Sequence, residues 1–518
     1  MVLKQNYQEK GLVPHRGATE SKLGITLQSA TRHCNSNRRD GSSWIVLLFV
    51  LLLFAMAPIS FGAEVTLANA IEKRDWNAVE KLLSDREQIK RSQPDGMTAL
   101  HWAVFHKRTE LVQQLLSNGA AVDALTDYEV TPLSIGCLQG DAASVKLLAV
   151  AGADVNRLMP GGEVPLLTAA RNGNADVVRV LLKHGAIVDA TERRGQTALM
   201  WAAAEGNADA VQVLIDAGAD LKRELKSGFN AMMFAAREGR IDVVRRLLDS
   251  GIDVNAVIGH DKSQGRGPRP GTSAMMLAVE SGHFELALYL VERGADPNDQ
   301  RSDYTPLHAL SWVRKPASGD GIDGDPSPRG SGSIPSLEFV RRMIYAGANV
   351  NTQLERGQAG KAKLNMKGAT PFLLACKTAD LPLLKVLLEL GADPKLVNVD
   401  NCTSLLAASG IGTVSVGEEP GTESEVIETI AFLLALGADI NAVDNNKETV
   451  MHGAAYRSHP KVAEFLAQNG SKPSVWNHKN QHNWTPMTIA QGSRPGSVKP
   501  DPAVIAVLEK LLKTDRTD

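Results

Sequence analysis

The sequence predicts an all-α repeat solenoid, because one short pattern returns at a fixed spacing. A glycine followed by a small or apolar residue recurs at Gly119, Gly152, Gly185, Gly218 and Gly251, in steps of 33 residues. A fixed period in this range indicates structural units that stack on one another. Each period also carries a helix-start signal and a Leu/Val stripe at helical spacing, so each unit is predicted to hold two helices.

The unit from Asp95 to Asp127 shows what each part of the period does. Thr98 is a good N-cap residue, because its side-chain oxygen accepts an orphan amide hydrogen bond, so the first helix begins there. A second helix follows, with an apolar stripe within Leu111–Leu116. Gly119 then lets the chain leave this helix with a positive φ. The segment up to the next helix is too short for a third helix and is predicted to form a hairpin or turn, called a tip below.

The same helix start recurs as Thr131-Pro132-Leu133, Thr305-Pro306-Leu307-His308, Thr370-Pro371-Phe372 and Thr485-Pro486-Met487. Pro suits the first helical position, because its missing N–H is not needed there. This pattern resembles the ankyrin repeat, and the resemblance covers about 450 residues. It implies stacked helix-turn-helix ankyrin repeats with β-hairpin or turn tips, in about eleven units including caps.

The position three residues after the helix-start residue has two kinds of occupant. His101 and His308 are expected to form a structural hydrogen bond to the turn there. Met200, Met233 and Met276 take the same slot in the middle repeats, and we expect them to fill the core, since Met is an adaptable apolar side chain.

Composition and charge exclude a strong electrostatic field of either sign. The chain has 518 residues, with 56 basic and 58 acidic side chains and a net charge of −2, so no nucleic-acid partner is predicted. Of its four cysteines, Cys34 lies near the N-terminus, and Cys137, Cys376 and Cys402 are far apart, so we expect core thiols and no disulfide framework. The length would suit several domains, but the repeat favours one long solenoid, expected to be monomeric.

The N-terminal region differs from the repeats. Residues 1–43 form a polar, basic leader, and residues 44–63 form an uncharged apolar run that Pro58 interrupts. Its continuous apolar part, Trp44–Ala57, has about the length of a signal-peptide h-region and falls short of the roughly 20 apolar residues of a membrane span, and small residues at Gly62 and Ala63 suit cleavage. We therefore expect an exported protein of bacterial type, periplasmic or secreted. The alternative is a retained membrane anchor in residues 44–63, with the repeats on the outer side.

The remaining chain divides by the regularity of its period. We expect an N-terminal capping repeat in residues 64–94, regular ankyrin repeats in 95–257, repeats with loop insertions in 258–475 and a C-terminal capping repeat in 476–518. Beyond Gly251 the steps lengthen to 43, 53, 44 and 46 residues. The excess falls in four Gly-, Pro- or Ser-containing inserts that are predicted to be loops, 259–271 and 353–368 in tips, and 315–335 and 410–424 between the two helices of a unit.

No motif in the chain supports catalysis or a cofactor. Residues 319–324 match G-x-G-x-x-G literally, but they follow no predicted strand and carry acids that would repel a phosphate. Asp320, Asp323 and Asp325 offer oxygen ligands without the spacing of a known calcium loop, so a solvated insert is the simpler interpretation. Two pairs of histidines lack a third ligand nearby in sequence, His101/His106 and His478/His482. We predict no catalytic residue, no metal site and no cofactor.

A binding surface is the functional feature that the sequence predicts. Solenoids present extended surfaces, and the resemblance implies that tips and first helices contact protein partners. Two enlarged tips are basic and are predicted to engage an acidic patch on a partner, with Lys262, Arg266 and Arg269 in one and Arg356, Lys361, Lys363 and Lys367 in the other. A solubilising loop without a partner is the alternative.

Three aromatic side chains share one equivalent slot, Trp102, Trp201 and Phe234. One interpretation makes them partner anchors that line the concave groove, and the other is packing between neighbouring helices. The overall prediction is an exported protein–protein interaction module, a scaffold or adaptor whose partner is unknown. A membrane-tethered scaffold is the alternative, and an enzyme or metal-dependent protein with its site in the inserts at 315–335 or 410–424 is a third.

Overall fold

The computed structural model describes residues 65–159, 161–259, 268–317, 328–357, 363–414, 416–417, 419–494 and 499–514. The helices of these ranges belong to a unit that runs from Thr66 to Asp518. The predicted leader and the apolar run at 44–63 lie outside the described residues.

The described part of the chain contains twelve helix pairs, each with a first and a second helix. The first helices are α3 (Leu67–Glu72), α6 (Ala99–Phe105), α8 (Pro132–Gln139), α10 (Pro165–Asn172), α12 (Ala198–Glu205), α14 (Ala231–Arg237), α16 (Ala274–Glu280), α18 (Pro306–Arg314), α20 (Pro371–Lys377), α22 (Ser404–Ser409), α24 (Val450–Arg457) and α27 (Pro486–Ala490). The second helices are α4 (Trp76–Leu82), α7 (Thr109–Ser117), α9 (Ala142–Val150), α11 (Ala175–Lys183), α13 (Ala208–Asp216), α15 (Ile241–Asp249), α17 (Phe284–Glu292), α19 (Ser336–Tyr345), α21 (Leu381–Glu389), α23 (Glu423–Ala435), α25 (Pro460–Gln468) and α28 (Pro502–Thr514).

Two short helices, α5 (Arg86–Lys90) and α26 (Pro473–Trp476), lie outside this pairing. Twelve pairs are one more than the sequence suggested, because the period is lost at the ends of the array, where α3 has six residues and α27 has five.

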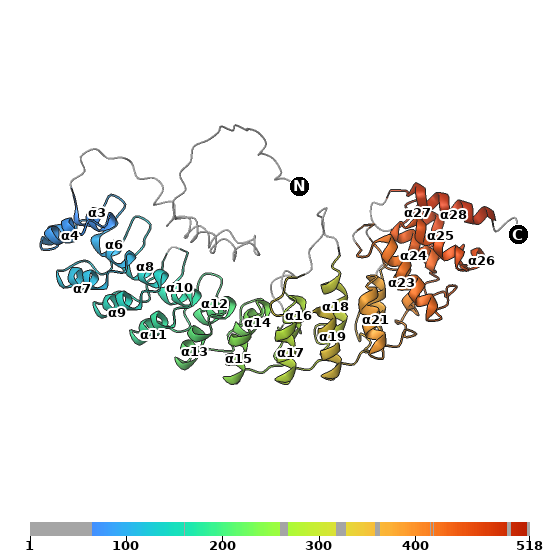
Figure 1. Cartoon of the computed structure of the whole chain (residues 1–518), viewed down its shortest axis with the longest axis horizontal. Coiled ribbons are helices and arrows are strands. Elements are labelled where there is room, and N and C mark those ends of the chain that lie inside the picture. The colour runs from blue at the N-terminus through green and yellow to red at the C-terminus, as the bar shows by residue number, and fades with distance from the viewer. Residues whose placement is uncertain are drawn as a thin grey trace, which may run out of the picture. The chain divides into compact units, whose positions relative to one another are not determined.

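The helices are arranged in two layers (Figure 1). Each first helix packs on the first helix of the next pair, from α3 through to α27. The second helices pack on one another from α7 to α15 and again from α17 to α28. The prediction of an all-α repeat solenoid is therefore confirmed, and no unit in the described ranges buries its apolar face alone.

Local sequence signals place the helix ends as expected. The Thr98 side chain accepts a hydrogen bond from the His101 N–H at the start of α6, and Thr370 accepts one from the Leu373 N–H at the start of α20. Gly185, which follows α11, has a φ of 92°. A Cβ added at Gly185 would meet no atom within 4 Å, so backbone conformation alone, and not crowding, favours glycine there.

The core lies between the two layers and is built from Ala, Leu, Val and Met. Met200, Met233 and Met276 are almost completely buried, which confirms that they fill the core. Cys137 and Cys402 are buried free thiols, and burial raises the pKa of both well above the usual range. Thiols in this state act as small apolar side chains, as expected.

The tips are turns and contain no strand among the described residues. Three isolated bridges occur there, Ser92 with Thr98, Thr191 with Thr197 and Val257 with Ser273. Backbone hydrogen bonds instead join one tip to the next: the Asp127 N–H donates to the Asp95 carbonyl (2.9 Å), and the Asn445 N–H donates to the Asp400 carbonyl (2.8 Å). Neighbouring tips are therefore held side by side.

In three units, a histidine links the first helix to the following unit. His308 Nδ1 lies 2.7 Å from the Thr305 hydroxyl, and its Nε2 lies 3.1 Å from the Ala369 carbonyl, directly before the next N-cap. His101 and His452 make the same two contacts in their units. Burial lowers the pKa of all three imidazoles to about 4, so they are neutral at pH 7 and Nε2–H donates to the carbonyl. The expected hydrogen bond to the turn is confirmed, and the contact with the next unit is an addition.

Asparagine side chains form a second link between units, which we call the asparagine clamp. Asn298 Nδ2 donates to the Gly347 carbonyl (2.9 Å), and its Oδ1 accepts from the Asn349 N–H (2.8 Å). Asn351 makes the same pair of bonds with Gly391 (3.0 Å) and Asp393 (2.8 Å). The same pair of bonds is also made by Asn156, Asn255 and Asn441.

Replacing His308 by Met, the residue that the middle repeats use, tests the histidine link. At neutral pH the variant should be less stable by about 1–3 kcal/mol, because the buried Ala369 carbonyl loses its donor. Folding lowers the pKa of His308 from 6.5 to about 4, so between these values the unfolded chain binds a proton more readily than the folded chain. The stability of the wild type should therefore fall as the pH drops from about 6.5 towards 4. Urea unfolding at several pH values should therefore show the difference between the two proteins shrinking over this interval. A difference in unfolding free energy that does not change with pH would contradict the assignment of a neutral His308 that donates to the Ala369 carbonyl.

Candidate binding surface

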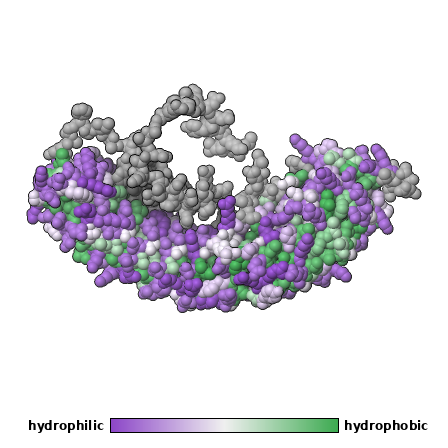
Figure 2. All heavy atoms as spheres, viewed as in Figure 1, coloured by the Kyte–Doolittle hydropathy of each residue, from purple (hydrophilic) through white to green (hydrophobic). Residues whose placement is uncertain are grey.

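The predicted basic tips lie partly within the described residues. Arg269, Arg356, Lys363 and Lys367 are all exposed. Three of the predicted residues lie outside the described ranges, Lys262, Arg266 and Lys361. Hydrophilic side chains cover much of the face of the molecule seen in Figure 2.

The two basic tips meet the same intervening tip, the one directly before α18. The Arg269 guanidinium lies over the Tyr304 ring, 5.2 Å from its centroid, on one side. On the other side, Arg356 Nη1 lies 3.6 Å from Asp303 Oδ1. This ion pair is exposed and contributes little stability by itself, but it shows that the tips before α16, α18 and α20 form one continuous row.

Hydrogen bonds between side chain and backbone, and a close approach of two backbones, also hold this row together. The Gln300 side-chain oxygen accepts from the Glu355 N–H (3.2 Å), and its amide donates to the Gln353 carbonyl (3.3 Å). On the opposite flank, a Cβ added at Gly271 would lie 1.9 Å from the Arg301 carbonyl oxygen. Only glycine permits this approach of two tips, so their spacing is built into the backbone.

The three aromatic candidates differ in exposure. Trp102 and Phe234 are 5% and 7% exposed, which favours packing between neighbouring helices over direct partner contact. Trp201 is half-buried, with the Arg171 guanidinium 5.3 Å from its ring centroid. Its Nε1 is buried and has no hydrogen-bond partner among the described residues. Because Trp201 is the most exposed of the three, it is the aromatic side chain of this slot that best fits an anchor.

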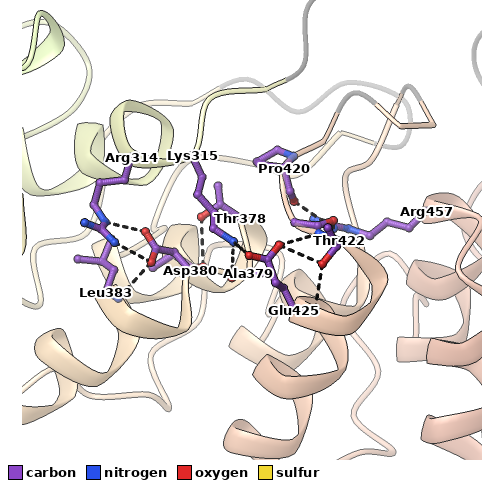
Figure 3. Close-up of polar contacts among 12 residues, drawn as sticks. Arg314, Lys315, Thr378, Ala379, Asp380, Leu383, Pro420, Thr422, Glu425 and Arg457 are labelled. Carbon is purple, nitrogen blue, oxygen red and sulfur yellow. Dashed lines mark hydrogen bonds and ion pairs between the residues drawn. The ribbon is translucent and has the colours of Figure 1, made fainter. Parts of the chain in front are cut away.

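The opposite edge, where each first helix turns into the second, carries a network of ion pairs that we call the clasp (Figure 3). Arg314 at the end of α18 binds both oxygens of Asp380, at 2.7 and 3.1 Å. Asp380 also accepts from the Leu383 N–H and so caps α21. The next residue, Lys315, pairs with Glu425 in α23 at 2.7 Å. The clasp thus joins three successive units, beside the start of the insert 315–335 and the end of the insert 410–424.

Two buried arginines fasten the insert 410–424. Arg457 donates to the Lys377 carbonyl (2.6 Å) and the Pro420 carbonyl (3.2 Å), and its pKa is lowered by burial. Arg494 lies over the Tyr456 ring, 5.5 Å from its centroid, and donates to the Val414 carbonyl (3.1 Å). Sequence reasoning missed both arginines, because no local pattern shows that a surface-type residue will be buried against distant carbonyls.

The described end of the insert 315–335 packs back onto earlier units. His283, at the start of α17, accepts from the Ser331 N–H at Nδ1 (2.7 Å) and donates to the Arg237 carbonyl at Nε2 (2.9 Å). Burial lowers the pKa of His283, which keeps the imidazole neutral and able to play both roles. The described end of this insert therefore contacts the turns between the helices of earlier units.

The remaining motifs give no assembled site. The stretch 319–324 and the acids Asp320, Asp323 and Asp325 lie outside the described residues. Across the described ranges, no group of three or more His, Cys, Asp or Glu side chains is placed to hold a metal ion. Among the described residues, no helix has the length and apolar character needed to cross a bilayer, and residues 44–63 lie outside them.

Family models support the identity of the repeats. The model described as "Ankyrin repeats (3 copies)" matches residues 67–159, 135–224 and 166–258, and "Ankyrin repeats (many copies)" matches 274–312 and 423–467. Together these matches span more than half of the chain. The chain belongs to the ankyrin-repeat family, whose fold typically serves as a protein-binding scaffold without catalytic chemistry.

The curated relatives share only a small part of their own length with this chain. "Neurogenic locus notch homolog protein 1" of Danio rerio is 31% identical over 199 residues, which cover 34% of this chain and 8% of that protein. "Tyrosine-protein kinase HTK16" of Hydra vulgaris is 30% identical over 93 residues, 17% of this chain and 12% of that protein. Among solved structures, the human ASB11 ankyrin repeat domain is 21% identical with a TM-score of 0.38, covering 51% of this chain and 100% of that domain.

Proposed function

We propose that this protein is a scaffold that binds an acidic patch of a protein partner through the row of tips before α16, α18 and α20. The observation that carries the proposal is the placement of Arg269 and Arg356 on the two sides of one tip. Exposed Lys363 and Lys367 extend the same basic surface. A fixed row of this kind presents its charges without a large loss of conformational entropy on binding.

Binding of this type needs no bond chemistry, so we assign the protein no catalytic residue and no cofactor. The inserts at 315–335 and 410–424 were the predicted alternative place for an enzymatic or metal-dependent site. Their described parts are fastened to helices by Lys315, Arg457 and Arg494, which supports a structural role. Trp201 and the tip surface remain the residues to which we assign partner contact.

The experiment compares two sets of three lysine substitutions in the full chain. One variant carries Lys→Ser at Lys361, Lys363 and Lys367 in the basic tip. The control carries Lys→Ser at Lys73, Lys81 and Lys90, which are exposed in the N-terminal cap. Crosslinking in extract of the producing cells should capture a protein with the wild-type chain and the control, and about tenfold less with the tip variant, since charges at an interface rim steer association.

Capture should also weaken at high salt, because exposed charges are screened. Equal capture by the tip variant and the control would show that the basic tip only solubilises the chain. Capture that is unchanged between low and high salt would contradict the charged-tip mechanism even if a partner is found.

We further propose that the repeats are exported, on the basis of the uncharged run at 44–63. The full chain is to be expressed in a bacterium and fractionated, and its N-terminus determined by mass spectrometry. A periplasmic product that begins near Gly62 or Ala63 is the expected result. An intact chain in the membrane fraction would favour the anchor, and an intact chain in the cytoplasm would contradict export.

A further inference from the structure

A small polar cavity of about 30 Å³ lies among the tips of the C-terminal units. Carboxylates of two successive tips line it: Asp400 before α22, and Asp444 and Glu448 before α24. Asn365 and Asn446 also line the cavity, and their side-chain amides donate to the Asp400 carboxylate at 3.3 Å each. The cavity therefore collects three acids in a chain whose net charge is close to zero.

Asp444 is the unusual member of this group. Its side chain is 5% exposed, and its Oδ1 accepts from the Asn446 N–H (2.9 Å) and the Glu448 N–H (2.7 Å). Its Oδ2 is buried and has no hydrogen-bond partner among the described residues. A buried carboxylate oxygen without a donor is costly, so this atom indicates that a donor is missing.

The tips of the neighbouring units have an asparagine at the position of Asp444. Asn398 and Asn480 occupy the equivalent positions and accept the same two backbone N–H groups. Their Nδ2 groups then donate, from Asn398 to the Asn365 carbonyl (2.8 Å) and from Asn480 to Glu448 Oε1 (2.8 Å). Asp444 thus presents an acceptor where the neighbouring tips present a donor, which creates a position for a donor from outside the chain.

The charges around the cavity favour a cationic donor. Burial raises the pKa of Asp444 to about 6 and that of Glu448 to about 7, because the charged forms are poorly solvated there. Lys363 lines the cavity but is exposed, and His482 also lines it. A positive group placed inside would relieve the repulsion between Asp444 and Asp400.

The size and geometry of the cavity select among cations. A volume of about 30 Å³ has room for a group of the size of a water molecule, so a compact ammonium group fits. A metal ion such as calcium needs six to eight oxygen ligands. Asn365 and Asn446 direct N–H groups into the cluster, and the described residues contain no group of metal-ligating side chains placed for an ion.

We propose that this cavity receives the ammonium group of a lysine side chain on the protein partner. One of its N–H donors can serve the free Asp444 oxygen, and its charge offsets the acids that line the same cavity. The inference rests on the proposed function, since it concerns the same line of tips. It adds that the partner carries a lysine beside its acidic patch.

The test is saturation-transfer NMR on the full chain with the peptide N-acetyl-Gly-Lys-Gly-amide. At about pH 8, above the pKa of both acids, saturation should reach the lysine ε-methylene group. Asp444→Asn should lower the peptide affinity about tenfold, because a charge-assisted hydrogen bond is lost. This variant should fold, since Asn occupies the same slot in both neighbouring tips.

Two controls make the result specific. Asp220→Asn removes an exposed carboxylate that caps a turn far from the cavity, and it should leave peptide binding unchanged. A peptide with norleucine in place of lysine has the same length without the charge, and it should give no saturation. Equal saturation of Asp444→Asn and wild type, or equal response to the norleucine peptide, would overturn the proposal.

A calcium titration separates the remaining alternative. If calcium raises the melting temperature of wild type but not of Asp444→Asn, and the lysine peptide gives no saturation, the cavity is a metal site and the proposal is wrong. The capture experiment removes Lys363 from the cavity lining, but Asp444→Asn leaves every lysine of the basic tip in place, and the peptide test does not depend on a captured partner. Failure of one proposal is therefore distinguishable from failure of the other.

Discussion

The structure depends on side chains that bond one unit to the next. The asparagine clamp uses both ends of one amide: Asn351 donates to the Gly391 carbonyl and accepts from the Asp393 N–H. Its acceptor carbonyl belongs to a glycine with φ of 93°, so the recurring glycine and the recurring asparagine have one structural cause. The histidine link adds a second connection on the helix side, where His308 reaches the Ala369 carbonyl. Because no unit buries its core alone, these bonds help to set the register between the units that they join.

This arrangement explains where the chain tolerates extra residues. The inserts at 259–271 and 353–368 lengthen tips, and those at 315–335 and 410–424 lengthen the turn between two helices. Neither place interrupts a helix, and long surface loops add only a slowly growing entropic cost. The buried pair of Arg314 and Asp380 then fixes the geometry beside an insert, where loss of one partner would leave an uncompensated charge.

The sequence predicts the parts of the fold that follow from local rules. A Thr at a helix start, a Gly at its end and a Leu/Val stripe need only nearby residues, which is why Thr98 and Gly119 were interpreted correctly. Contacts between distant segments were not predictable. Arg457 binds a carbonyl 80 residues away, and the side chain that covers Arg269 is Tyr304 in the next tip. Asp444 has a carboxylate oxygen where Asn398 has an amide N–H₂ group. The sequence does not show that this oxygen is buried without a hydrogen-bond donor, because that depends on the surrounding tips.

The central claim is that the links between units hold the tips in a fixed row. Hydrogen exchange of the full chain, followed by mass spectrometry, tests it with Asn351→Ala, which removes one clamp, and with Asn469→Ala, whose amide bonds only its own helix. The account predicts faster exchange in Asn351→Ala both at Asp393 and at Val399 further along the same tip, whose N–H bonds the Lys367 carbonyl of the neighbouring tip. Faster exchange at Asp393 with unchanged protection at Val399 would contradict it, because the tips would then be held independently of the clamp.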